Sequence, residues 1–215
     1  MALSKIQPAS MDLTANYAFT GTNSVAGLEY AEKKLATLTA SSSSTLSFTS
    51  NIDSTYNIYK FRFIDIHPQT ANYEFDFQGT TDGTNYNISM TTTTFSTFHD
   101  EAGSSPALSY ASGRDQANGT SFQALSHDIK ADSDSSLSGE LFLFDPSSTT
   151  FVKHFISDTN YMQNGDATQR AFCSGYFNTT TAITGIRFQM ESGNIDSGTI
   201  EMYGINKGGN NAKIS

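Results

Sequence analysis

Charged residues are scarce in this chain of 215 residues, since Asp, Glu, Lys and Arg together make up 15% of it. Proline occurs only four times, and two of these residues, Pro68 and Pro146, follow runs of β-branched and aromatic residues. Ser, Thr and Asn supply 29, 27 and 15 residues, about a third of the chain. A surface of hydroxyls and amides disfavours long solvent-exposed helices and favours short strands joined by turns.

Tryptophan is absent, and cysteine occurs once, at Cys173. The 16 Phe and 10 Tyr residues must therefore supply much of the core. A single cysteine excludes an intramolecular disulfide, and Cys173 lies in a strand-like run, so we expect a buried thiol.

Basic clusters and long hydrophobic runs are also missing. The net charge is −9, and no group of basic residues is larger than the pair Lys33 and Lys34. This charge disfavours binding to nucleic-acid phosphates and to anionic lipid. No apolar run approaches the roughly 20 residues that span a bilayer, and the N-terminus has no apolar signal-peptide core. We therefore expect no nucleic-acid partner, no membrane insertion, and a chain that is made in the cytoplasm and stays there unless it leaves as part of a larger assembly.

The densest run of β-branched and aromatic residues spans positions 56–68. Tyr59, Phe61 and Phe63 alternate with polar residues at period two, which predicts a strand with one aromatic face. The alternation slips after Phe63, because Ile64 continues the opposite parity. That slip predicts a β-bulge near this point, or a strand end that is covered on both faces. Pro68 should end the pairing, because it has no backbone donor.

A second alternating run follows at once, with Tyr73, Phe75 and Phe77 on one face. Two such strands only a few residues apart predict a hairpin with a single aromatic face.

Further strand-like runs lie at short intervals before and after this pair, which brings the total to about ten strands. They cover residues 35–39, 45–49, 86–94, 122–129, 140–144, 150–157, 171–177, 185–191 and 198–205, and we expect loops over 99–117 and 158–168. The 140–144 and 150–157 runs should form a second hairpin. No helical pattern separates any two strands, which excludes a parallel sheet built from βαβ units.

The sequence thus predicts an all-β fold, an antiparallel β-sandwich of jelly-roll type. We expect one such domain over residues 34–206, a polar C-terminal tail over 207–215, and an N-terminal arm over 1–33. The predicted core comprises Phe61, Phe63, Phe75, Phe77, Ile88, Leu141, Leu143, Phe155, Phe188 and Ile200.

The first 30 residues contain apolar side chains that follow no sustained period. The candidate contact residues of this segment are Leu3, Ile6, Met11, Leu13, Tyr17 and Phe19. Burying each of these side chains is worth roughly 1.5–3 kcal/mol, whereas ordering the backbone costs roughly 1–2 kcal/mol per residue. Only a large contact surface would hold such a segment, so we expect it to order on neighbouring chains and to serve as an assembly anchor. A mobile tail is the alternative.

No pattern in the chain carries catalytic or cofactor chemistry. There is no nucleophile elbow, phosphate-binding loop or dinucleotide-binding glycine motif, and the four histidines show no metal-ligand spacing. We therefore expect no enzymatic activity and no cofactor.

Two weaker site hypotheses remain beside that expectation. Asp128, Asp132, Asp134 and Glu140 supply oxygen ligands of the kind that calcium takes, although the 128–140 segment lacks the order and the glycine of an EF-hand loop. Tyr110, Tyr161 and Tyr176 lie in loop-like or strand-end positions and offer rings on which a sugar would stack, so a carbohydrate-binding or hydrolytic sandwich is the alternative from another class. Tyr110 and Tyr161 are the candidate surface contacts.

Several stretches together resemble a known family. They are MALSKIQPASMDLTANYAFTGT at the start, KLATLTASSSSTLSFTSNID, FIDIHPQTANYEFDFQGTTDGTNYN, LFDPSSTTFVKHFIS, and SGNIDSGTIEMYGI near the end. These stretches look like virion structural proteins of tailed bacteriophages of marine bacteria, which are often described as tail-fibre-like.

This resemblance implies a non-enzymatic virion protein and supplies no catalytic residues. The expected function is a tail-fibre or appendage component, anchored by its N-terminal arm and with its sandwich projecting from the particle. A decoration protein on the head surface is the alternative within the virion. The expected partners are copies of itself, with a trimer expected by analogy with other phage appendages, other virion proteins, and a glycan on the host surface.

Overall fold

The computed structural model describes residues 32–205, which form thirteen β-strands and one short 3-10 helix, η2 (Ser112–Arg114). The strands are β1 (Glu32–Thr39), β2 (Leu46–Phe48), β3 (Ile58–Pro68), β4 (Phe75–Thr80), β5 (Met90–Asp100), β6 (Ala107–Tyr110), β7 (Ala117–Gly119), β8 (Gln123–Ala124), β9 (Leu137–Phe144), β10 (Lys153–Gln163), β11 (Ala167–Phe177), β12 (Gly185–Met190) and β13 (Ile195–Ile205). Within this range no helix is long and apolar enough to cross a membrane. The predicted all-β class is confirmed.

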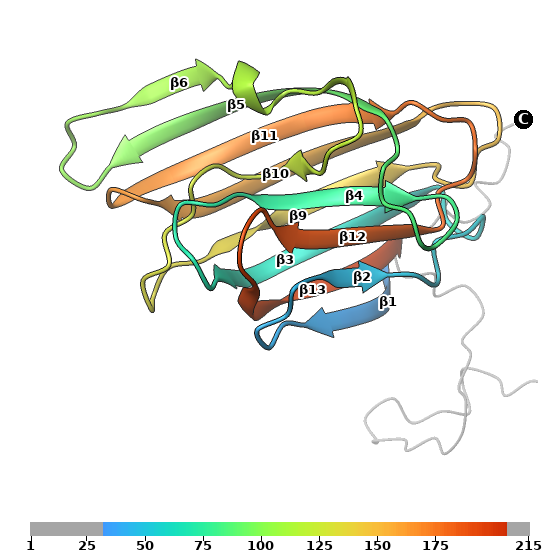
Figure 1. The fold of residues 1–215 in the computed structure, drawn as a ribbon, viewed down its shortest axis with the longest axis horizontal. Coiled ribbons are helices and arrows are strands. Elements are labelled where there is room, and N and C mark those ends of the chain that lie inside the picture. Colours follow the sequence, from blue (N-terminus) through green and yellow to red (C-terminus); the bar gives the residue numbers. More distant parts are fainter. Residues whose placement is uncertain (1–31, 206–215) are drawn as a thin grey trace, which may run out of the picture.

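The strands form two antiparallel sheets that pack as a sandwich. The larger sheet has nine strands in the order β1-β13-β3-β9-β10-β11-β5-β6, with β7 also paired to β5, and the smaller sheet has the order β2-β12-β4-β8. In Figure 1 the smaller sheet lies in front of the larger one, and β11, β5 and β6 extend beyond it at the top. The segment from η2 to β8 runs over this extension.

The predicted hairpin of the two aromatic strands is wrong. The strand at 58–68 is β3, which pairs with β13 and β9 in the larger sheet, whereas the strand at 75–80 is β4, which pairs with β12 and β8 in the smaller sheet. Two strands with one apolar face each bury more surface when those faces meet across a sandwich than when they lie side by side.

The second predicted hairpin is confirmed, because β9 and β10 pair antiparallel.

The core between the sheets is built from aromatic rings, as expected. Nine of the ten predicted core residues are at most 1% exposed, and the tenth, Ile88, is half-buried and packs against the core. Phe188 of β12 lies at the centre of the core. Its ring is within 6.3 Å, centroid to centroid, of the rings of Phe48, Phe61, Phe63, Phe75 and Phe77.

The predicted bulge after Phe63 is present in β3. Phe63 pairs with Gly139 and Ile66 pairs with Leu137, so β3 uses three steps where β9 uses two. The extra residue, Asp65, has a φ of 50°. Such a bulge returns Ile66 to the buried face, where it is fully covered. Pro68 ends β3, as predicted.

Two segments predicted as loops contain strand residues. Most of 158–168 belongs to β10 and β11, which meet in a tight turn at 164–166, and 99–117 holds the end of β5, all of β6 and the start of β7. These strands lack apolar alternation because the inner face of the sheet is itself polar here. Thr159 of β10 is 1% exposed and Gln169 of β11 is 7% exposed, and the neighbouring Thr92, Thr94 and Ser96 of β5 are all at most 8% exposed.

Candidate functional site

The outer face of the larger sheet, which points away from the smaller sheet, carries the main candidate surface. Alternation along each strand directs every second side chain to this face. Cross-strand pairing then arranges those side chains in rows that run across the sheet. We divide the face into a charged network, an aromatic edge and, between them, a hollow.

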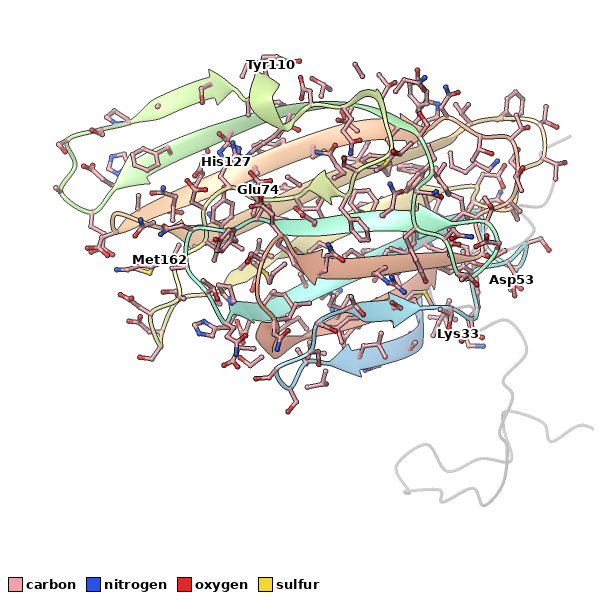
Figure 2. The ribbon with its side chains drawn as sticks, in the orientation of Figure 1. Lys33, Asp53, Glu74, Tyr110, His127 and Met162 are labelled. Atoms are coloured by element: carbon pink, nitrogen blue, oxygen red, sulfur yellow. The ribbon has the colours of Figure 1, made fainter. Side chains whose placement is uncertain are left out.

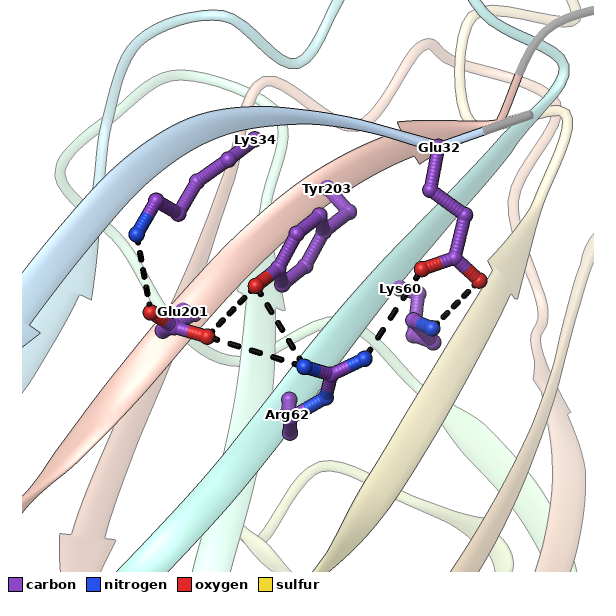
Figure 3. Close-up of polar contacts among 6 residues, drawn as sticks. All are labelled: Glu32, Lys34, Lys60, Arg62, Glu201 and Tyr203. Carbon is purple, nitrogen blue, oxygen red and sulfur yellow. Dashed lines mark hydrogen bonds and ion pairs between the residues drawn. The ribbon is translucent and has the colours of Figure 1, made fainter. Parts of the chain in front are cut away.

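The charged network lies over β1, β13 and β3 and comprises Glu32, Lys34, Lys60, Arg62, Glu201 and Tyr203 (Figure 3). Lys34 Nζ is 3.0 Å from Glu201 Oε1, and the Tyr203 hydroxyl donates to Glu201 Oε2 at 2.5 Å. The hydrogen bond from Tyr203, together with that from Lys34, holds the pKa of Glu201 below its ordinary value. The network therefore favours the ionised form of Glu201 and ties β1, β13 and β3 together.

Glu32, the first described residue of β1, belongs to this network. Its carboxylate contacts Lys60 and lies 3.8 Å from Arg62. The Arg62 guanidinium in turn lies over the Tyr203 ring, 4.9 Å from its centroid. The start of β1 is thus held by half-buried ion pairs.

The aromatic edge lies at the other end of the sheet, over β11, β5 and β6. Phe95 of β5 pairs with Tyr110 of β6, and its ring stacks on that of Phe172 with 4.8 Å between centroids. Leu108 is 71% exposed and Tyr110 is 63% exposed. Figure 2 places Tyr110 at this outer edge. The edge presents apolar surface to its surroundings.

A separate polar centre lies where β4 meets the segment that covers β5 and β11. Arg114 of η2 has its Nε 2.7 Å from Glu74 Oε1 and a terminal nitrogen 3.6 Å from Asp128 Oδ1. Asp76 is buried next to this pair, and its Oδ1 has no hydrogen-bond partner among the described residues. Figure 2 shows Glu74 and His127 in this region.

Two groups of the polar centre have strongly shifted pKa values. Burial, then the charges of Glu74 and Glu191, raises the pKa of Asp76 to about 8. Burial, then the nearby Arg114, lowers the pKa of His127 to about 4. At neutral pH the centre therefore holds a protonated carboxyl and a neutral imidazole.

Asp76 and His127, the two strongly shifted groups, are not open to a ligand. The pocket beside it, of about 360 Å³, is lined by Glu74 and Arg114 together with residues of the 113–124 segment. Neither Asp76 nor His127 lines this pocket. His127 instead contacts Gln169 through Nδ1 and donates its backbone N–H to the Tyr161 hydroxyl at 2.7 Å. These groups are arranged to support the fold.

The three tyrosines predicted as ligand contacts lie in different places and do not form one site. Tyr110 is exposed, and its hydroxyl contacts Asp115. Tyr176 lies on the outer face of β11. Tyr161 is only 2% exposed, so its prediction as a surface contact is wrong. It belongs to β10 rather than to a loop, and its odd position in that strand points inward.

The acidic residues of the calcium hypothesis do not converge. Asp132 pairs with Lys130, and Asp128 lies near Arg114. Across residues 32–205, no three His, Cys, Asp or Glu side chains are placed to hold a metal ion.

The predicted anchor residues Leu3, Ile6, Met11, Leu13, Tyr17 and Phe19, and the predicted tail, lie outside the described residues. The charged network was missed by sequence analysis, because its members come from three strands that are distant in sequence. The available signal in the sequence was that polar residues occupy alternate positions of β3 and β13, such as Lys60 and Arg62 in β3.

No protein-family model, curated protein or solved structure matches this chain.

Proposed function

We propose that this chain is a non-enzymatic structural protein of a tailed-phage virion. The residues that precede β1 anchor it, so the predicted arm ends at residue 31 instead of residue 33, because Glu32 and Lys33 pair with β13. The sandwich projects from the particle as part of a tail appendage. One observation carries the proposal beyond the sequence resemblance. Five of the six large hydrophobic side chains that are exposed in residues 32–205 share the outer face of the larger sheet, namely Ile64, Phe95, Leu108, Tyr110 and Ile156. Apolar groups gathered on one face are typical of a contact surface.

The proposed topology is a jelly roll of eight strands. Its support is the strand order, in which β1-β13-β3-β9 form one four-stranded half and β2-β12-β4-β8 form the other. On this proposal β10, β11, β5 and β6 extend the first half, and β7 pairs at its margin. Jelly rolls recur in viral coat proteins and in lectins, which is an analogy of fold alone.

The proposed partners are copies of the same chain, as a trimer, and other virion proteins. The exposed edge of β6 and the aromatic side chains beside it supply the surface for lateral contacts. The proposed location is the assembled virion, and neither nucleic acid nor a membrane is part of the proposal.

The test is to purify phage particles from the host that carries the gene and to measure the copy number of the chain by quantitative mass spectrometry. Gene variants that lack residues 1–30 or residues 207–215 are compared with the wild type. We expect the first deletion to leave folded protein in the soluble fraction and the second to leave the copy number unchanged.

Antibody labelling in electron micrographs then gives the position. Labels at the tail support the proposal, whereas labels over the head favour a decoration protein. Absence of the chain from purified particles contradicts the virion function, and normal incorporation without residues 1–30 contradicts the anchor.

A further inference from the structure

The hollow on the outer face of the larger sheet lies over β10, β11 and β5. It has a volume of about 500 Å³ and is open to solvent. Two cross-strand rows build it. His154, Tyr176 and Thr91 form the first row, and Ile156, Ser174 and Thr93 form the second.

The hollow exists because two short side chains lie among long ones. Ser174 and Thr93 are paired across β11 and β5, and both belong to the outward parity of their strands. Around them the sheet carries the rings of Tyr176 and His154 in one row and the half-exposed Ile156 in their own row. The hollow thus has hydroxyl groups on its floor and apolar or aromatic groups at its walls.

The aromatic wall is held in position. The rings of His154 and Tyr176 pack edge to face, with 5.8 Å between centroids and 62° between planes. Such a pair restricts both side chains before any ligand arrives. Thr91, the third member of this row, accepts a hydrogen bond from the backbone N–H of Asn118 at 3.2 Å, so its side chain is oriented as well.

The charge of the lining selects the class of ligand. No Asp, Glu, Lys or Arg is among the side chains that line this hollow. An ionic ligand would lose its hydration there without gaining a partner of opposite charge, and the net charge of −9 on the chain further disfavours polyanions. Hydroxyl groups both donate and accept hydrogen bonds, and a pyranose ring offers hydroxyls at its rim and an apolar face for stacking.

We propose that this hollow binds a neutral saccharide, which stacks on Tyr176 and forms hydrogen bonds with the hydroxyls of Ser174 and Thr93. The site does not depend on the virion function, because an isolated domain would bind the same ligand. The hollow is also distinct from the polar centre around Arg114, with which it shares no lining residue.

The test uses the full-length protein on an array of neutral and acidic oligosaccharides and bacterial surface polysaccharides, followed by titration calorimetry with the strongest neutral hit. Tyr176→Ala removes the stacking ring, and Ser174→Met fills the floor. Tyr110→Ala and Thr168→Met are the matched controls, because they change exposed positions outside the hollow. We expect at least a tenfold loss of affinity in the first pair and less than a twofold change in the controls.

Three results would overturn the proposal. The first is that no neutral glycan binds, and the second is that Tyr176→Ala binds as the wild type does. The third is that Ser174→Met converts an oligomer to a monomer in sedimentation velocity, which would make the hollow a contact between copies of the chain. Release of reducing sugar that Tyr176→Ala abolishes would support the saccharide site and would contradict only the non-enzymatic function.

Discussion

The rings of Phe63 in β3 and Phe75 in β4 meet edge to face across the interior of the sandwich, with 5.2 Å between centroids and 83° between planes. The two residues belong to consecutive strands, yet these strands lie in different sheets. Their contact joins the sheets at the same place where both rings meet Phe188. The stability of the sandwich should therefore depend strongly on this cluster of rings.

We expect Phe188→Ala to lower the free energy of unfolding by about 3–5 kcal/mol, because it leaves a large cavity among five other rings. Guanidinium unfolding followed by tyrosine fluorescence measures this. Phe151→Ala is the control, since Phe151 is 69% exposed in the turn between β9 and β10, and it should change the free energy by less than about 0.5 kcal/mol. Equal effects of the two substitutions would mean that the rings do not form the core.

The bulge in β3 predicts a strict requirement for glycine at position 198. Gly198 has a φ of 116°, and a Cβ there would lie 2.5 Å from the carbonyl oxygen of Asp65. Gly198→Ala should therefore destabilise the fold by more than the roughly 1–2 kcal/mol that left-handed backbone alone costs. Gly83→Ala separates the two causes, because Gly83 has a φ of 77° and open space around it. Thermal unfolding of both variants checks this, and a larger loss at Gly83 would contradict the predicted clash.

The buried Asp76 predicts that stability falls as pH rises. Its pKa is 3.8 for the free side chain and about 8 in the fold, so above pH 4 the unfolded chain releases a proton that the folded chain retains. The free energy of unfolding should then fall by up to about 1.4 kcal/mol per pH unit until the pH passes 8. The pKa of His127 is lowered from 6.5 to about 4, so its titration makes the free energy of unfolding rise with pH below pH 6.5. The clearest window is therefore pH 6.5–8.

Asp76→Asn should remove most of this slope and stabilise the protein at pH 8, because asparagine resembles the protonated acid. Burial also raises the pKa of Glu74, which leaves a smaller slope of the same sign. Urea unfolding at several pH values measures the effect, with Asp134→Asn as an exposed control. An unchanged slope in Asp76→Asn would show that Asp76 is ionised in the fold.

The ion pair between Lys60 and Glu32 predicts that the stability of the fold depends on both partners. The side chain of Lys60 is 6% exposed, whereas that of Glu32 is 36% exposed. Glu32→Gln should cost about 1–3 kcal/mol, because it leaves a buried ammonium without its carboxylate. Adding Lys60→Met to this variant should recover part of the loss. Denaturant unfolding of the single and double variants tests the coupling, and Lys33→Ala is the exposed control. Purely additive losses would contradict it.

The local features of the chain were accessible from its sequence. Alternation at Phe61, Phe63, Phe75 and Phe77 identified buried side chains, because the period of two is a property of each strand by itself. The bulge was predicted from the slip after Phe63, since an extra residue in a strand changes the parity of everything that follows.

The sequence was less informative where a polar face is buried. Thr92, Thr94 and Ser96 look like solvent-facing positions, and Tyr161 looks like a loop residue, but the segment from η2 to β8 and its neighbours cover them. Whether a polar side chain is buried depends on what is laid over it, and no local period records that.

The sequence by itself determined that this chain is all-β, which positions point inward along its aromatic strands, and where its main bulge lies, because these follow from backbone periodicity and residue chemistry. Only the tertiary structure decided that β3 and β4 face each other instead of pairing. It also decided that Lys60 meets Glu32, and that Tyr176 stands beside the short side chains of Ser174 and Thr93. These relationships depend on how the strands are placed against one another, which no strand records by itself, and they are selected by the total surface that both sheets bury together.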